Sequence, residues 1–139
     1  MAEGTLDLEI VTPAQVLLRA PVTEFVGPGW NGQFGVFPGH QSMVVALRPG
    51  VVRYTLADRT THHIAVGGGF AVVEADRATI LADVAEAAGD IDVDRARNAE
   101  GRARKSLEGL GLDAPDYADQ KAALDRAVAR IDAAAARAL

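Results

Sequence analysis

The segment AEAAGDIDVDRA, residues 85–96, separates two parts of the chain that have different hydrophobic periods. Before this segment, apolar residues alternate with polar ones or form short runs bounded by turn residues, a pattern typical of antiparallel strands. After it, the large apolar residues follow a helical spacing and alanine becomes the commonest residue. The sequence therefore predicts a mainly β unit at residues 1–88, followed by a helical unit at residues 89–139.

The first unit is predicted to be a β-sandwich, or flattened barrel, of short antiparallel strands. Leu6, Leu8 and Ile10 alternate with Asp7 and Glu9. The apolar stretches that follow are QVLL, TEFV, GVF, MVVAL, VVRYT, HHIAV, FAVVE and ATILA. The expected turns include PG, NG, RPG, GGG and EADR, which contain residues that adopt positive φ or fix φ near the proline value.

The second unit is predicted to form an antiparallel pair of helices. The first helix begins among Asp90, Asp92 and Asp94, and basic residues in its last turns suit the helix dipole. Gly109 and Gly111 are expected to end it. The second helix is expected to begin with Asp113 as its cap and Pro115 in its first turn.

The docking of this hairpin onto the β unit is expected to be marginal. Leu124, Val128 and Ile131 form the apolar stripe of the second helix, which otherwise consists largely of alanine. At about 1.5 to 3 kcal/mol for each large buried aliphatic side chain, the stripe contributes little once ordering costs are subtracted. Two interpretations follow from this composition: a detachable, mobile hairpin, or alanines that simply permit close helix packing.

Composition excludes several classes of function. Apolar residues make up 49% of the 139 residues and charged residues 24%, as in a soluble globular protein. The net charge is -5 and the basic residues are interleaved with acidic ones, so nucleic acid is not an expected partner. There is no cysteine, no signal-like N-terminus and no long apolar run, so we expect membrane association only through another protein.

The residues do not form a recognisable catalytic or metal-binding motif. Ser42 and Ser106 lack the surroundings of a nucleophile, and no glycine-rich stretch matches a phosphate-binding loop. The histidines His40, His62 and His63 have no metal-ligand spacing. One alternative stays open at this point, namely a small β-sandwich enzyme or a metal- or ligand-binding module with a helical extension. Its metal would lie among His40, one of the paired histidines, and an acid such as Glu74 or Asp83.

Six motifs in order resemble those of the epsilon subunit of bacterial F-type ATP synthase. They are VTP (11–13), GQFGVFPGH (32–40), LRPGVV (47–52), IAVGGGFAVV (64–73), TILADVAE (79–86) and IDVDRA (91–96). The resemblance extends over nearly the whole chain, and the family's β-sandwich followed by a helical hairpin agrees with the fold predicted from periodicity.

The resemblance implies a non-catalytic subunit of the central stalk, or rotor, of a proton-translocating ATP synthase. Such a subunit is present as a single copy in a hetero-oligomer. Its β-sandwich binds the gamma subunit and the ring of c subunits, and its mobile hairpin extends toward the alpha and beta subunits to inhibit ATP hydrolysis. The implied location is the cytoplasmic face of the bacterial inner membrane, as a peripheral protein. No cofactor or metal is required, although ATP is implied as a regulatory ligand.

The resemblance also implies roles for three groups of residues. The c-ring contacts are Trp30, Asn31, Gln33 and His40, where Asn31 and Gln33 are neutral at positions that are acidic in many family members. The residues for regulatory ATP are Glu86, Asp92, Arg95, Arg102, Arg126 and Arg130, with Asp92 equally suited to a helix N-cap. The inhibitory contacts with the catalytic subunits are Lys121, Arg126, Arg130 and Arg137.

Overall fold

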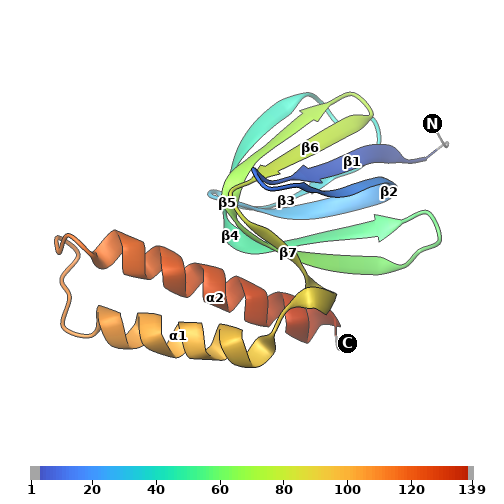
Figure 1. Ribbon diagram of the computed structural model, residues 1–139. Helices are drawn as coiled ribbons and strands as arrows, with labels where there is room; N and C mark the ends of the chain where they lie inside the picture. The colour runs from blue at the N-terminus through green and yellow to red at the C-terminus, as the bar shows by residue number, and fades with distance from the viewer. Residues whose placement is uncertain (1–3, 138–139) are drawn as a thin grey trace.

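Seven β-strands precede the helices in the computed structural model, which describes residues 4–137 of the chain and the side chains of residues 4–136 (Figure 1). The strands are β1 (Leu6–Val11), β2 (Val16–Gly29), β3 (Gly32–Val36), β4 (Met43–Leu56), β5 (Thr61–Glu74), β6 (Arg77–Ala82) and β7 (Ala85–Ala87).

The strands close into a flattened barrel. Their order is β1-β6-β5-β4-β2, and β1 also pairs with β2, which completes the ring. The β1–β6 pair is parallel and the other pairs are antiparallel. The short strands β3 and β7 add to the ring at β2 and β5. This arrangement confirms the predicted sandwich or flattened barrel.

The strands β4 and β5 are longer than the sequence pattern predicted. They form one continuous antiparallel ladder from Thr55 opposite Thr61 to Met43 opposite Val73. The predicted turns RPG and GGG therefore lie inside strands, and that prediction is wrong. The physical reason is that a long strand in a small closed barrel must bend, and Gly69 bends β5 with a φ of 125°. A side chain on Gly69 would also overlap the carbonyl oxygen of Leu81 on β6.

Alternate residues of the strands fill the barrel interior. Leu6 and Ile10 of β1 are completely buried, as is Phe25 of β2. The Phe25 ring meets that of Phe34 edge to face, with 6.2 Å between the ring centroids. Truncation of a buried aromatic such as Phe25 to alanine costs about 3 to 5 kcal/mol, so this ring contributes strongly to the stability of the barrel.

The C-terminal part forms the predicted antiparallel hairpin. It consists of a short 3-10 helix, η1 (Ala88–Asp90), and two α-helices, α1 (Val93–Leu107) and α2 (Tyr117–Arg137). Asp92 caps α1, as the sequence allowed. The prediction that α2 starts at Asp113 and Pro115 is wrong, because the helix starts at Tyr117. Tight turns lengthen the connection, and one of them is closed by the hydrogen bond from the Ala114 amide to the Gly111 carbonyl. Neither α-helix within residues 4–137 is long and apolar enough to cross a membrane.

The helix α2 lies between the barrel and α1, as Figure 1 shows, and packs on β4 and β5. Its contact with the barrel consists of small side chains. The buried cluster contains Ala65, Ala88, Ala129 and Ala133, with Val51 and Ile91 packed against it.

The predicted apolar stripe of α2 carries less of the packing than expected. Leu124 is buried, but Val128 and Ile131 are only half-buried. The alanines of α2 permit close approach to β5, so methyl groups make the contact that larger side chains were expected to make. The buried interface is therefore close but small in apolar area.

Candidate functional site

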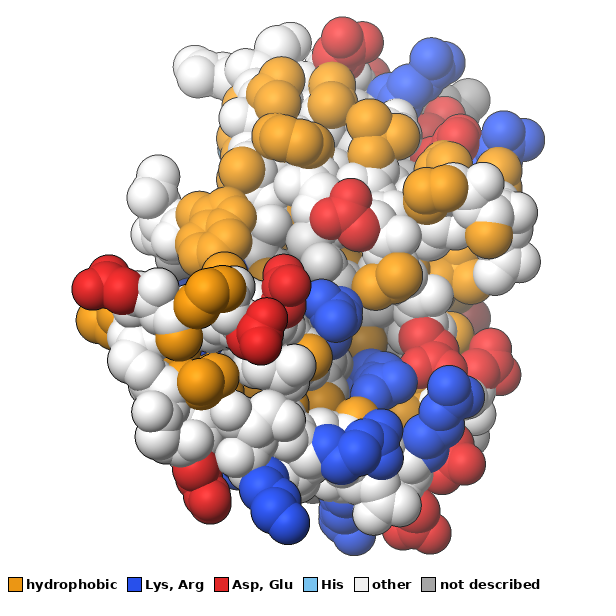
Figure 2. All heavy atoms as spheres, turned by 60° about the vertical axis from the view of Figure 1, so that its left-hand side comes forward, with side chains coloured by type: hydrophobic (Ala, Val, Ile, Leu, Met, Phe, Trp, Pro, Cys, Tyr) orange, Lys and Arg blue, Asp and Glu red, His pale blue; other side chains and the backbone are white. Residues whose placement is uncertain are grey.

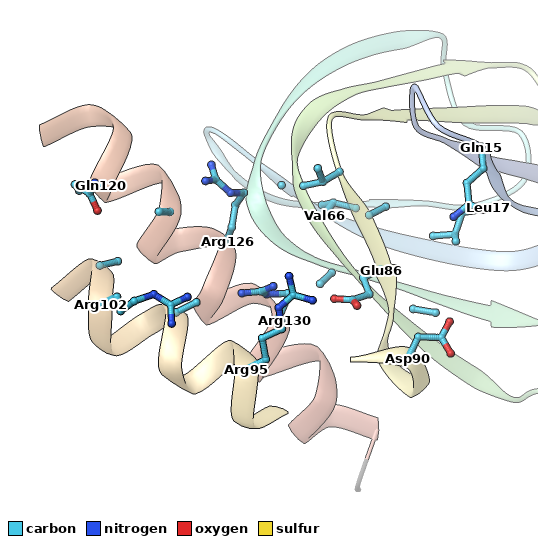
Figure 3. Close-up of a pocket in the computed structure, with 18 residues that line it drawn as sticks. Gln15, Leu17, Val66, Glu86, Asp90, Arg95, Arg102, Gln120, Arg126 and Arg130 are labelled. Atoms are coloured by element: carbon cyan, nitrogen blue, oxygen red, sulfur yellow. The ribbon is translucent and has the colours of Figure 1, made fainter. Parts of the chain in front are cut away.

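A pocket of about 740 Å³ lies between the barrel, α1 and α2 (Figure 3). This volume is within the range of small-molecule sites. We call it the arginine pocket, after the four arginines that line it together with two acids. These charged residues are Glu86, Asp90, Arg95, Arg102, Arg126 and Arg130.

Each structural element contributes part of the charged lining. Glu86 belongs to β7 and lies opposite Ala65 of β5 in the sheet. Arg95 and Arg102 are seven residues apart on α1, so they share one face of that helix. Arg126 and Arg130 are four residues apart on α2 and also share a face. The pocket therefore forms only while the hairpin is docked on the barrel.

Figure 3 shows how these side chains are directed. Arg95 and Arg130 point toward one another across the gap between the two helices, and Glu86 faces them from β7. Arg126 rises from α2 beside the barrel wall at Val66. The guanidinium groups are thus distributed around one cavity instead of being paired with neighbours on their own helices.

The four arginines have no ion-pair partner in the described part of the chain. The ion pairs among residues 4–136 are Arg19–Glu9, Arg104–Glu100 and Lys121–Asp125, and all three lie outside the pocket. The Nε atom of Arg130 is buried and lacks a hydrogen-bond partner. A buried donor without an acceptor costs about 1 to 3 kcal/mol, so Arg130 favours a ligand that supplies one.

The remaining lining divides the arginine pocket by chemistry. One wall is apolar and comes from Leu17 and Ala85, while Gln15 and Gln120 supply amide groups. Guanidinium forks bind phosphate or carboxylate oxygens in pairs, and an apolar wall suits a flat ring. The arrangement is suited to an anionic ligand that has several oxygens and a less polar end.

Five of the six residues predicted for ATP line this pocket, and the exception is Asp92. The Asp92 carboxylate accepts a hydrogen bond from the backbone amide of Arg95 at 3.1 Å, and Asp92 is the N-cap of α1. Asp90, which the sequence analysis placed only at the start of the helix, lines the pocket instead.

The residues predicted for the c ring follow β3 along one side of the barrel. Trp30, Asn31 and Gln33 are exposed, and the Trp30 ring lies 5.8 Å from the guanidinium carbon of Arg48. His40 lies beyond the other end of β3, is half-buried, and has its Nδ1 atom 2.7 Å from the carbonyl oxygen of Gln41.

The predicted inhibitory residues are engaged differently in the docked hairpin. Lys121 pairs with Asp125 one turn further along α2, at 2.8 Å. Arg126 and Arg130 belong to the arginine pocket. The side chain of Arg137 lies outside the described residues.

The histidines do not assemble a metal site. Within the described residues, no three His, Asp or Glu side chains are grouped as metal ligands would be. His62 stacks on Tyr54, with ring centroids 5.3 Å apart. His63 lines a groove of about 730 Å³ on the other side of α2, together with Arg53 of β4 and Asp125 and Asp132 of the helix. Burial lowers the pKa of His63, with a further contribution from the positive charge of Arg53.

Sequence reasoning missed an apolar patch on the outer surface of the barrel. We call it the outer apolar patch, formed by Val44 of β4, Phe70 and Val72 of β5 and Leu81 of β6. Phe70 lies opposite Leu81, and Val72 lies opposite Val44. Phe70 is 52% exposed and Leu81 is 48% exposed.

Figure 2 shows hydrophobic side chains gathered over the barrel and basic ones gathered over the hairpin. The signal in the sequence that could have indicated the outer apolar patch was the run FAVV, because it places apolar side chains on both faces of a strand.

A closed barrel that shares an arginine-lined pocket with a helical hairpin, and that also exposes an apolar patch, is typical of subunits that bind other proteins. Residues 5–88 match the family model for the β-sandwich domain of the ATP synthase delta/epsilon chain. Residues 90–135 match the model for the long α-helix domain of the same chain. The chain belongs to the ATP synthase epsilon chain family, and the resemblance inferred from its motifs is confirmed.

Curated relatives match this chain over nearly its full length. The ATP synthase epsilon chain of Nitratidesulfovibrio vulgaris is 45% identical and covers 93% of this chain and 95% of that protein. The epsilon chain of Moorella thermoacetica is 42% identical, with 96% and 98% covered. As an epsilon chain, the protein is a non-catalytic stalk subunit of ATP synthase.

Solved structures share the fold at low sequence identity. A chain in the mitochondrial ATP synthase of Euglena gracilis superposes with a TM-score of 0.82 at 22% identity, covering 97% of this chain and 84% of that one. A chain in the central stalk and c-ring structure of Tetrahymena thermophila ATP synthase gives 0.63 at 15% identity, with 92% and 95% covered.

Proposed function

We propose that this subunit couples the c ring to the gamma subunit and restrains ATP hydrolysis through its hairpin, and that ATP in the arginine pocket favours the docked hairpin. The observation on which this proposal rests is a pocket built jointly by the barrel and both helices, in which the buried Nε of Arg130 lacks a partner. A ligand bound there contacts all three parts at once.

ATP fits the chemistry of this lining. Its phosphates supply acceptor oxygens for the guanidinium groups on the two helices, and its adenosine suits the apolar wall at Leu17 and Ala85. Because the pocket exists only in the docked state, ATP binding raises the ratio of docked to undocked protein. That ratio increases with the ATP concentration divided by the dissociation constant of ATP.

The interface between α2 and the barrel is suited to a reversible change. Its buried cluster is made of alanines from β5, η1 and α2, with few large side chains. The apolar area lost on undocking is therefore small, while the barrel keeps its own separate core. Docked and extended states of similar free energy are the condition for regulation by a ligand.

The same arginines serve both states in this proposal. In the docked state Arg126 and Arg130 bind ATP, and in the extended state they contact acidic residues of the alpha and beta subunits together with Lys121 and Arg137. The two sets of contacts exclude one another, so ATP binding and inhibition compete for the helix.

The barrel provides the contacts with the rest of the rotor. The outer apolar patch is the surface we assign to the gamma subunit, because adjacent exposed apolar side chains on three strands mark an interaction site. Trp30, Asn31, Gln33 and His40 follow β3 toward the c ring, where neutral amides make hydrogen bonds instead of ion pairs. We assign the subunit, as a single copy, to the cytoplasmic face of a bacterial inner membrane, where it is peripheral to the complex.

Two experiments test the proposal separately. Titration of the isolated protein with ATP by calorimetry tests the pocket, and we expect binding that Arg130→Met weakens about tenfold, the loss of one charged hydrogen-bonding group. Truncation after Ala88 in the assembled complex tests regulation, and we expect faster ATP hydrolysis with coupling retained. An unchanged hydrolysis rate contradicts the regulatory role, and a lack of ATP binding contradicts the assignment of the pocket.

A further inference from the structure

The helix α2 crosses strand β5 at Gly67. A Cβ atom placed on Gly67 would lie 3.1 Å from the Cδ and 3.4 Å from the Cγ of Arg126, and it would overlap a methyl group of Val84. The aliphatic stem of Arg126 therefore rests directly on the backbone of β5. Close approach of a side chain to a backbone is a common reason for glycine within a strand.

The requirement for glycine at this position is steric and does not come from backbone conformation. Gly68 and Gly69 have φ values of 110° and 125°, which favour glycine, whereas Gly67 is not among the residues with positive φ. An alanine at position 67 could adopt the local backbone but would need space that Arg126 and Val84 occupy.

The strand cannot easily move away to create that space. The amide of Gly67 donates to the Val84 carbonyl at 2.9 Å, and Gly67 pairs with Pro49 in the β4–β5 ladder. The helix is held less firmly, because its contact with the barrel is the small cluster around Ala65, Ala129 and Ala133. A side chain at position 67 should therefore displace α2 instead of β5.

We infer that Gly67 is a positioning residue for the arginine pocket. It lets the stem of Arg126 lie flat on β5, which sets the height of α2 above the barrel and places Arg130, one turn further along, within the pocket. Ala65, two residues earlier on the same face of β5, continues this flat surface under Ala129 and Ala133. The nucleotide part of this inference rests on the proposed function, whereas the docking part does not.

The test measures docking and ATP binding separately in the full-length isolated protein. The chain has no cysteine, so Asp76→Cys on the barrel and Ala135→Cys on the exposed face of α2 allow a pair of fluorophores to report their separation. ATP affinity is measured on the same variants without labels.

The variants separate the two contacts that a Cβ at position 67 would make. Gly67→Ala combined with Val84→Ala removes the overlap within the barrel and leaves the contact with Arg126. We expect this double variant to show a longer fluorophore distance and an apparent ATP affinity reduced about tenfold, in proportion to its smaller docked fraction. Val84→Ala alone and Gly35→Ala, whose Cβ would make only ordinary contacts near 3.9 Å, should keep the short fluorophore distance of the unsubstituted protein. Because Val84 also lines the arginine pocket, the ATP affinity of the double variant is compared with that of Val84→Ala alone.

Adding Arg126→Ala to the double variant provides the decisive comparison. Removal of the stem should restore the short distance without restoring ATP affinity, because one guanidinium of the pocket is then missing. The inference is overturned if the double variant stays docked, or if removal of the Arg126 side chain does not restore docking. If the unsubstituted protein is docked but binds no ATP, the proposed nucleotide site fails while the docking role of Gly67 is still measured.

Discussion

The carboxylate of Asp92 accepts a hydrogen bond from the backbone amide of Arg95, with 3.1 Å between the two atoms. This bond satisfies one of the free amides in the first turn of α1 and fixes the start of the helix. The side chain of Arg95 therefore extends into the arginine pocket from a helical turn that this bond fixes. In the motif IDVDRA, Asp92 thus holds the backbone from which Arg95 extends.

The first prediction separates capping by Asp92 from direct contact with a ligand. Asp92→Ala should lower the stability of α1 by about 1 kcal/mol, because the cap is lost. Asp92→Asn should change that stability little, because asparagine caps helices about as well as aspartate. Hydrogen exchange of the α1 amides measures the stability, and calorimetry measures ATP affinity, which we expect Asp92→Asn to leave within about twofold. A loss of ATP affinity in Asp92→Asn with normal exchange would assign the carboxylate to the ligand instead.

The second prediction concerns the buried Nε of Arg130. Arg130→Met keeps the aliphatic stem and removes the unpartnered donor, so without ATP the docked hairpin should be as stable as before, or more stable by up to about 1 kcal/mol. With ATP the same variant should bind about tenfold more weakly, because a charged hydrogen-bonding group is missing.

Opposite effects on docking and on affinity are characteristic of a residue kept for binding. Arg104→Met is the matched control, because Arg104 is also on the hairpin but pairs with Glu100 outside the pocket. Urea unfolding followed by helical circular dichroism, together with calorimetry, would check both quantities. If Arg130→Met destabilises the unliganded hairpin, Arg130 is structural and the pocket loses its main support.

Local signals in the sequence were sufficient for the hairpin, whereas the arginines of the pocket were named from the resemblance to the family. Asp92 and the glycine at position 109, which has a φ of 75°, act within a few residues of their positions, so the first helix was predicted correctly. The arginines at 126 and 130 share a face for the same local reason. The place of Asp90 in the lining was missed because η1, which carries it, packs on α2 and β5, and contacts between elements far apart in the chain are not visible in the local sequence.

The strands were harder to predict because glycine serves two purposes in a closed barrel. In GGG at residues 67–69, positive φ at two positions bends β5, while the first glycine makes space for α2. Neither requirement is visible without the neighbouring elements, so a turn was the natural interpretation. The outward position of Phe70 likewise depends on the register of β5, which a run of apolar residues does not define.

The third prediction tests the outer apolar patch as the surface for the gamma subunit. Phe70→Ser with Leu81→Ser should prevent copurification with the gamma subunit, because the two side chains lie opposite one another and supply adjacent apolar area. The barrel should stay folded, because both side chains are about half exposed and lie outside the core.

Val16→Ser is a suitable control for the patch, since Val16 is similarly exposed, at 46%, but lies at the start of β2. Copurification of the tagged subunit measures binding, and thermal unfolding of the isolated variants measures folding. If the double variant still binds gamma as the control does, the patch is not the principal contact.

The fourth prediction is a dependence of stability on pH that arises from His63. Burial lowers the pKa of His63 from its ordinary value of 6.5, and the positive charges of Arg53 and His62 lower the pKa further. The unfolded chain therefore takes up a proton near pH 6.5, while the folded chain takes it up only at lower pH. The contribution of His63 to the free energy of unfolding is complete above pH 6.5 and is lost as the pH falls toward the folded pKa.

A titration of the histidine ring signals by nuclear magnetic resonance would measure this pKa directly. We expect a value below 6.5 for His63, and a higher value in Arg53→Gln, because one of the opposing charges is removed. His63 lies in the groove that Arg53 of β4 and Asp125 and Asp132 of α2 also line. In urea unfolding, the unsubstituted protein should lose more stability between pH 7.5 and 5.5 than His63→Gln does. An equal loss in both proteins, or a His63 pKa at or above 6.5, would show that burial by the hairpin and barrel does not govern this group.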